Sequence, residues 1–224
     1  MKTITMFLAT VVAMVICFSV IPNEAPAEGM PKVLMIPREG YSQDIQLMLE
    51  KEVGTMRRII MTAGFKVIVA TASGMRIVSP GMDLEPDLKL VDVKLSDYVG
   101  VIMPCMAVGG IPGPPVAPEA VTIVKQAVAE GKPVAAQFGS VIILARAGVL
   151  KGKKYSFLDD PLKPTWYRKQ TDPSFEGGIY GGRDVVEDGN IITSTICPYL
   201  ERMMGIPTTT TKLTELFVAQ LKKK

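Results

Sequence analysis

Residues 131–154 read GKPVAAQFGSVIILARAGVLKGKK, and this segment carries most of the information about the architecture of the chain. Its apolar run at residues 133–136 is typical of a buried strand, residues 138–140 of a sharp turn, and residues 141–147 of a helix that ends at a glycine. In α/β enzymes such a strand-turn-helix elbow presents a nucleophile to the backbone amides of the helix N-terminus. Here the projecting residue is Phe138, whose ring cannot act as a nucleophile.

The rest of the chain alternates between short apolar runs and segments with helical spacing of apolar residues. This alternation predicts a mainly parallel sheet covered by helices on both faces, which is a flavodoxin-like three-layer α/β/α sandwich. The predicted strands are residues 32–37, 66–71, 88–93, 99–104 and 154–158, followed by a hairpin over residues 184–194; the predicted helices are residues 43–63, 117–130 and 211–221.

The N-terminal 27 residues have the composition of a secretory signal peptide. A basic residue near the start precedes an apolar run at residues 4–21, and Ala25-Pro26-Ala27 fits a cleavage site. We therefore expect a single mature domain of residues 28–224, exported to the periplasm or beyond the cell. The alternative is an uncleaved anchor, since the apolar run is nearly long enough to span a bilayer, and only then do we expect contact with a membrane.

The segment at residues 131–154 resembles the elbow of the ThiJ/PfpI family, the family of the Parkinson's-associated DJ protein, which usually reads close to GKPVAAICHGPxxLAxAGLLKGKK. Both flanks match, but residues 137–141 read QFGSV where the family has Ile-Cys-His-Gly-Pro. The resemblance extends over most of residues 32–221. It implies a divergent member of the class I glutamine amidotransferase-like superfamily that lacks the nucleophilic cysteine, whose position is taken by Phe138.

A second departure from the family pattern lies in the loop after the first strand. The family usually has Asp-Gly-Phe-Glu where this chain has Glu39-Gly40-Tyr41-Ser42. Ser42 thus stands in the place of the glutamate that hydrogen-bonds the cysteine in the family. Glu39 is a candidate substitute acid, and the alternative is that it is a solvated loop carboxylate.

The resemblance also indicates which residues surround the elbow. The family's Leu-Pro-Gly-Gly loop corresponds to the region of residues 103–110, which reads MPCMAVGG. The amides of the family's glycine pair line the pocket and stabilise an oxyanion there, which places Cys105 near the elbow. The residues that the resemblance places in the pocket are Gln137, Gly139, Met106 and Cys197.

Several classes of chemistry are excluded by the composition. The chain has no histidine, which excludes Ser-His and Cys-His catalysis and removes the commonest metal ligand. No glycine-rich phosphate loop of the Rossmann or Walker type occurs. The net charge is +3 with dispersed basic residues, which gives no nucleic-acid signature. We expect no metal, no cofactor and no nucleic-acid partner.

Cys105 and Cys197 are the cysteines that remain once the signal peptide is removed. An even number in an exported protein favours a disulfide between them. Two unreactive thiols, or a reactive thiolate at Cys105, are the other interpretations.

Two functional classes follow from these residues. We favour a pseudoenzyme that acts as a binding module for a small molecule or a protein, with Phe138 filling the former nucleophile site. The alternative is an atypical cysteine-dependent hydrolase or lyase of the protease, amidase or glyoxalase type, in which Cys105 attacks and Glu39 or a water accepts the proton. Residues 159–182 form a long insertion, which we interpret as a flap over the site, with Trp166 and Tyr167 as lid or anchor residues. The resemblance also implies a homodimer.

Overall fold

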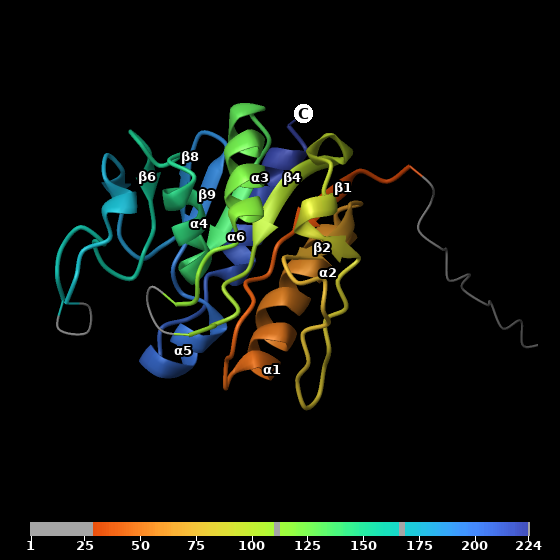
Figure 1. Cartoon of the computed structure of the whole chain (residues 1–224), viewed down its shortest axis with the longest axis horizontal. Coiled ribbons are helices and arrows are strands. Elements are labelled where there is room, and N and C mark those ends of the chain that lie inside the picture. Colours follow the sequence, from red (N-terminus) through yellow and green to blue (C-terminus); the bar gives the residue numbers. More distant parts are fainter. Residues whose placement is uncertain (1–28, 110–112, 166–168, 224) are drawn as a thin grey trace, which may run out of the picture.

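A seven-stranded sheet forms the centre of the computed structural model, which describes residues 29–109, 113–165 and 169–223 (Figure 1). The strand order is β3-β2-β1-β4-β5-β9-β8, and neighbouring strands are parallel except for the antiparallel pair β8 and β9. The strands are β1 Lys32–Met35, β2 Lys66–Thr71, β3 Leu88–Lys89, β4 Tyr98–Met103, β5 Val134–Gln137, β8 Val186–Asp188 and β9 Ile191–Ser194.

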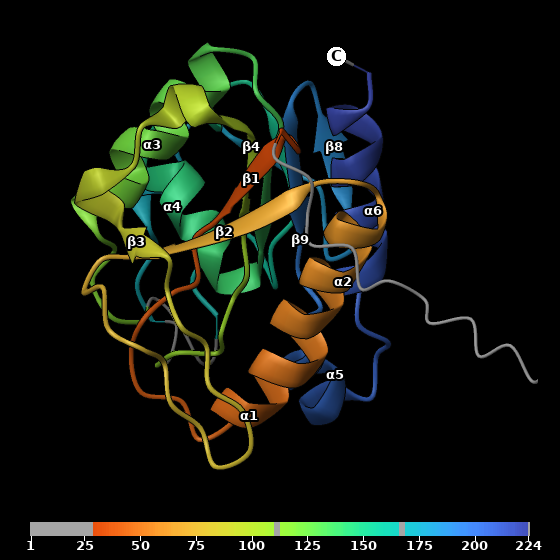
Figure 2. The same ribbon diagram turned by 90° about the vertical axis from the view of Figure 1, so that its right-hand side faces the viewer.

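Helices cover both faces of this sheet. Figure 2 shows α3 and α4 on one face and α2 and α6 on the other. The helices are α1 Ile45–Met48, α2 Gly54–Thr62, α3 Pro118–Ala129, α4 Val141–Arg146, α5 Pro198–Met204 and α6 Thr210–Leu221, and a π-helical segment, Leu49–Val53, joins α1 to α2. This arrangement confirms the predicted flavodoxin-like three-layer sandwich.

Alternation of side chains along the strands divides the core into two layers. In β1, Leu34 packs with the cluster beneath α3 and α4, whereas Val33 and Met35 pack with the cluster beneath α2 and α6. Successive strand residues point to opposite faces. Because both faces are covered, the central strands β1, β2 and β4 read as nearly unbroken apolar runs.

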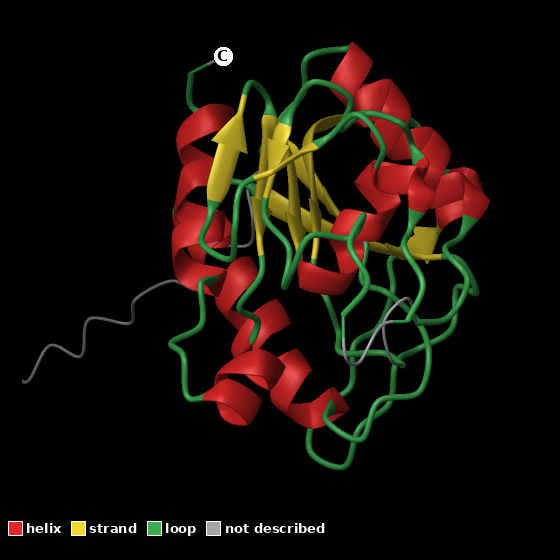
Figure 3. Ribbon diagram, turned by 90° about the vertical axis from the view of Figure 1, so that its left-hand side faces the viewer, coloured by secondary structure: helices red, strands yellow, loops and turns green. Residues whose placement is uncertain are grey.

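Parallel strands bring their carboxyl ends to one edge of the sheet. The loops after β1, β4, β5 and β9 therefore gather there, and Figure 3 shows loops filling the region beyond that edge. The chain proceeds from β1 outward to β2 and β3, and then returns to the other side of β1 with β4. The edge between β1 and β4 is thus the point where the winding reverses, and crevices for ligands form at such points.

Some predicted elements are shorter or placed differently than expected. The predicted strand at residues 88–93 is reduced to Leu88–Lys89, since Leu90–Asp92 form a 3₁₀ turn that buries Leu90 in the core. The strand expected at residues 154–158 is β6 Lys154–Tyr155, which pairs outside the main sheet with β7 Ile179–Tyr180. Helix α5 was not predicted; Pro198 starts it and Gly205, at φ 67°, ends it.

The predicted signal peptide lies outside the described residues. Within the described ranges, no helix combines the length and the apolar character needed to cross a bilayer.

Candidate functional site

The elbow forms as predicted, but its central ring is part of the core. Phe138 has φ 39°, a strained conformation for a residue with a side chain. Its side chain is only 6 % exposed, and its ring centroid lies 5.7 Å from that of Phe157, which contacts Phe175 in turn. The Ser140 hydroxyl donates to the Pro104 carbonyl at 2.7 Å and ties the elbow to the loop after β4. The turn therefore keeps the shape of a nucleophile elbow while its side chain packs inward.

The sulfur of Cys105 lies against the backbone of this elbow. A Cβ atom built on Gly139 would lie 3.4 Å from the Cys105 Sγ atom. The Gly139 and Ala107 amides and the Cys197 side chain lie close enough to interact with that sulfur. Met106 and Ala107 are both in the left-handed region, at φ 62° and 49°, which turns the loop back on itself. The loop after β4 and the elbow thus form one cradle around a buried sulfur.

This cradle favours the thiolate form of Cys105. The hydrogen bond from Cys197, the amides of Gly139 and Ala107 and the charge of Arg38 together outweigh burial and lower the pKa of Cys105 to about 7. The pKa of Cys197 is raised well above its ordinary value by its interaction with Cys105 and by burial.

A buried carboxyl group supports the loop that carries Cys105. Glu52 is fully buried, and its two oxygens accept from the backbone amides of Cys105 and Met106, both at 2.9 Å. Burial raises the pKa of Glu52 well above its usual range, and the nearby charge of Cys105 raises it further. The two amide hydrogen bonds lower this pKa, but by less. Glu52 belongs to the π-helical segment Leu49–Val53. Such segments often occur at functional sites.

Arg38 connects the sulfur cradle with the surface. It follows β1, is 8 % exposed, and its Nη2 atom donates to the Pro114 carbonyl at 3.3 Å. Its Nη1 atom lies 2.6 Å from the position that a Cβ atom would take on Gly139, so a glycine is required for this approach. Burial lowers the pKa of Arg38, and the negative charge of Cys105 opposes that shift.

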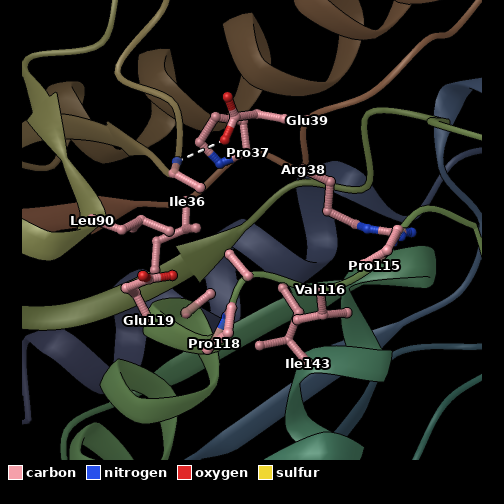
Figure 4. Close-up of a pocket in the computed structure, with 13 residues that line it drawn as sticks. Ile36, Pro37, Arg38, Glu39, Leu90, Pro115, Val116, Pro118, Glu119 and Ile143 are labelled. Atoms are coloured by element: carbon pink, nitrogen blue, oxygen red, sulfur yellow. Dashed lines mark hydrogen bonds between the residues drawn. The ribbon is translucent and has the colours of Figure 1, made fainter.

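A cavity of about 320 Å³ opens at the reversal point beside β1 (Figure 4). Its walls come from the end of β1, the start of α3 and α4, and most of them are apolar, as Leu90, Val116 and Ile143 illustrate. Arg38, Glu39 and Glu119 supply the charged groups. Glu39 accepts from the Ala72 amide at 2.6 Å, and from the amide and hydroxyl of Ser73. Among the described lining residues, Arg38 carries the one positive charge.

None of the residues expected in the pocket lines this cavity. Gln137 is buried and bridges the Ile196 carbonyl and the Thr210 hydroxyl, at 3.0 Å each. Met106 and Gly139 are buried as well, and so is Cys197, a free thiol like Cys105. The expected disulfide is not present in this structure.

The two candidates in the loop after β1, the acid Glu39 and the hydroxyl residue Ser42, make their hydrogen bonds away from Cys105. The carboxylate of Glu39 binds the loop after β2, as described above, so it is not placed as a proton acceptor for the sulfur. The hydroxyl of Ser42 accepts from the Asp44 amide at 3.1 Å, and Ser42 lines a neighbouring hollow of about 400 Å³ that shares Arg38 and Glu39 with the first cavity. The family's pairing of acid and nucleophile has no counterpart between these residues.

The insertion at residues 159–182 does not cover the cavity with any of its described residues. Instead it packs beside α4, and its buried Phe175 contacts Tyr155 and Phe157. Phe175 anchors this part on Phe157, which also contacts Phe138 of the elbow, and the interpretation as a flap over the elbow stays a prediction. Trp166 and Tyr167 lie outside the described residues.

Two residues of the site were missed from the sequence. Glu52 is an acidic residue within a helical stripe of apolar residues, and its neighbours Leu49, Val53 and Met56 are buried. That pattern is a usable signal for a buried carboxyl group. Arg38 follows the first strand, and a position at the carboxyl end of a parallel strand could have indicated a site residue. In the described part of the chain, no group of three or more potential metal-ligating acidic or cysteine side chains occurs.

Comparisons with known proteins agree with this arrangement. Residues 41–205 match the sequence pattern of the DJ-1/PfpI family. An uncharacterized protein from Archaeoglobus fulgidus is 36 % identical over 139 residues, which span 58 % of this chain and 73 % of that protein. An uncharacterized protein from Methanocaldococcus jannaschii is 33 % identical over 147 residues, 64 % of this chain and 66 % of that protein, or just under two thirds of its length.

Solved structures show the same fold. The ThiJ/PfpI domain protein from Brachyspira murdochii superposes with a TM-score of 0.62 at 18 % identity, covering 88 % of this chain and 99 % of that one. Drosophila melanogaster DJ-1beta superposes with a TM-score of 0.55 at 22 % identity, covering 87 % and 92 %. The match to the family pattern extends over well more than half of the sequence, so this chain belongs to the DJ-1/PfpI family.

Proposed function

We propose that this protein is a small-molecule binding member of its family, without the hydrolase activity of an elbow cysteine. The observation that carries this proposal is the burial of Phe138, whose ring packs on Phe157 at the turn where a nucleophile would project. The elbow then contributes structure and backbone amides, and the function moves to the adjacent cavity.

The size and composition of the cavity support a ligand that is mostly apolar. Its volume of about 320 Å³ lies at the lower end of the range of small-molecule pockets. Leu90, Val116 and Ile143 offer apolar contacts. A small aromatic or aliphatic group is the chemistry that these walls would accept.

The charges favour a carboxylate or another anion on that ligand. Arg38 is held near the cavity by the Pro114 carbonyl and can offer a charge-assisted hydrogen bond. Glu39 is already occupied by the Ala72 amide and by Ser73. Glu119 is exposed in the first turn of α3, where the helix dipole and solvent stabilise its charge.

The test is a matched series of ligands with one skeleton: phenylacetate, phenylacetamide, 2-phenylethanol and phenethylamine. Calorimetric titration and thermal shift should detect phenylacetate, because a ligand that binds only the folded state raises its apparent stability. Arg38→Met, which keeps the apolar stem, should weaken binding by about tenfold or more, since hydrogen bonds to charged groups contribute about 1.5–3 kcal/mol. Arg38→Lys should retain part of the affinity.

Arg146→Met is the matched control. The Arg146 side chain is 53 % exposed, pairs with Asp172 and lies outside the cavity, so its replacement removes one positive charge without changing the site. Equal binding of the amide or the amine, or unchanged phenylacetate affinity in Arg38→Met, would rule out the proposed ligand chemistry.

A second candidate function is a cysteine-dependent enzyme that uses Cys105. The hydrogen bonds that lower the pKa of Cys105 to about 7 favour it. Burial argues against it, because Cys105 is 2 % exposed and is not among the cavity-lining residues. Labelling the native protein with iodoacetamide and with a bulky maleimide separates the two. Fast labelling of Cys105 by both reagents supports the enzyme, whereas slow labelling supports the binding protein.

Export is part of the proposal and rests on the N-terminal sequence. Intact-mass measurement of the protein from periplasmic or culture fractions should show a chain that begins near Glu28. A full-length chain in the membrane fraction would support the uncleaved anchor instead.

A further inference from the structure

A second hollow lies next to the cavity at Arg38. It measures about 400 Å³, and its walls come from the loop after β1, the start of α1 and the loop after β2. Arg38 and Glu39, which Figure 4 shows at the first cavity, line both spaces. The two hollows are therefore neighbours across these two residues, and together their volumes fall well within the range of small-molecule sites.

The walls of the second hollow are largely apolar, and several of them are in contact with water. Tyr41, Met75 and Val78 are 84 %, 69 % and 62 % exposed, and the half-buried Ile45 and Ile77 lie in the same wall. Single exposed apolar side chains are common on protein surfaces, whereas several that surround one hollow mark a binding site.

Hydrogen bonds hold these walls in place. The Glu39 carboxylate joins the loop after β1 to the loop after β2, because it accepts from the Ala72 amide at 2.6 Å and from Ser73. The loop after β2 is closed by two backbone hydrogen bonds between Ile77 and Leu84, at 3.0 and 2.9 Å, and Leu84 is buried. A ligand would find the hollow already formed, which limits the ordering cost of binding.

The charges at the second hollow favour an apolar group inside it. Arg76 pairs with Asp83 at 3.4 Å and lies 3.9 Å from Glu85, so its positive charge is offset within its own loop. The carboxylate of Glu39 is engaged by the backbone, as described above. Arg38, at the boundary of the two spaces, is therefore the cation to which a ligand carboxylate is best matched.

We propose that the ligand of this site is an α-branched carboxylate that carries two apolar arms on its α carbon. The carboxylate binds Arg38, one arm fills the first cavity, and the other arm lies in the second hollow. This inference rests on the proposed function, because Arg38 anchors the carboxylate in both.

The test compares phenylacetate with 2-phenylhexanoate, which is phenylacetate with a butyl arm on the α carbon. Each methylene group removed from water raises affinity by about fourfold. Because Met75 and Val78 leave the wall partly open to water, the arm is buried only in part. We expect the tighter enantiomer of 2-phenylhexanoate to bind about tenfold or more tightly than phenylacetate in calorimetric titrations.

Two controls locate the second arm. The double variant Met75→Ser and Val78→Ser should lose most of the gain, whereas the double variant Met203→Ser and Val91→Ser should keep it. Met203 and Val91 are also exposed, at 61 % and 71 %, but line neither hollow. The isomer 4-butylphenylacetate has the same atoms with its butyl arm on the ring, so its affinity relative to phenylacetate should not depend on Met75 and Val78.

The results separate this inference from the proposed function. If phenylacetate binds but 2-phenylhexanoate binds no more tightly, or if the gain survives in the Met75→Ser and Val78→Ser variant, the second arm is overturned and the proposed function stands. If wild-type protein binds no phenylacetate, the proposed function is overturned and this inference with it.

Discussion

Replacing Phe138 tests whether the elbow ring is part of the core. The ring is 6 % exposed and contacts Phe157, so Phe138→Ala should remove a buried aromatic side chain and lower the free energy of unfolding by about 3–5 kcal/mol. If the ring instead projected toward a ligand, its removal would have little effect on stability.

The backbone of Phe138 gives a second, opposing contribution. At φ 39° a side chain is strained, and glycine relieves that strain. Phe138→Gly should therefore be more stable than Phe138→Ala by about 1 kcal/mol. The matched control is Phe217, fully buried within α6, where the order should reverse because glycine is less favourable than alanine in a helix by about 1 kcal/mol.

Urea unfolding under reducing conditions measures both effects, provided that the slope of the free energy against urea concentration stays constant among the variants. A loss below about 1 kcal/mol in Phe138→Ala would show that the ring is not a core residue. An alanine variant more stable than the glycine variant would refute the strained turn.

Three further predictions concern the groups around the sulfur. The rate of Cys105 alkylation should rise with pH, with a midpoint near the Cys105 pKa of about 7. Because this pKa lies below that of a free thiol, ionised Cys105 stabilises the fold above the free-thiol pKa, and this contribution is lost as pH falls through about 7. Urea titrations across that pH range can check it. Glu52→Gln replaces one of the two acceptor oxygens with an amide group and leaves one buried backbone N–H without its acceptor. The free energy of unfolding should fall by about 1–3 kcal/mol in urea titrations, and an unchanged midpoint would contradict the support of this loop by Glu52. Gly139→Ala places a Cβ atom where it displaces the flexible end of Arg38, so phenylacetate binding should weaken with little loss of stability, and wild-type affinity would show that Arg38 does not need that position.

The sequence predicted the fold well because its signals are local. Apolar strands, helical spacing and glycines at turns are each readable within a short window, and the strand-turn-helix elbow came out at nearly the predicted bounds. The errors lie where tertiary contacts decide. Leu90 ends the predicted edge strand because the core accepts it in a 3₁₀ turn.

The site was less accessible to prediction from the sequence. Its position at the strand ends and the presence of Cys105 near the elbow could be predicted from the family resemblance. The direction of the Phe138 ring could not, because both an exposed and a buried ring suit the same sequence at a turn. The contacts among Arg38, Glu52 and Cys105 join three separate elements, and no local pattern encodes which of them meet.

The central claim is that the function lies in the cavity beside Arg38 and no longer at the elbow residue. The most direct measurement is a phenylacetate titration of isotope-labelled protein, followed through the Arg38 side-chain N–H and the methyl groups of Leu90 and Ile143, which line the cavity. We predict saturable shifts of all three signals with one dissociation constant, and their loss in Arg38→Met. Shifts absent from these groups at saturating ligand, or confined to residues outside the cavity, would contradict the account.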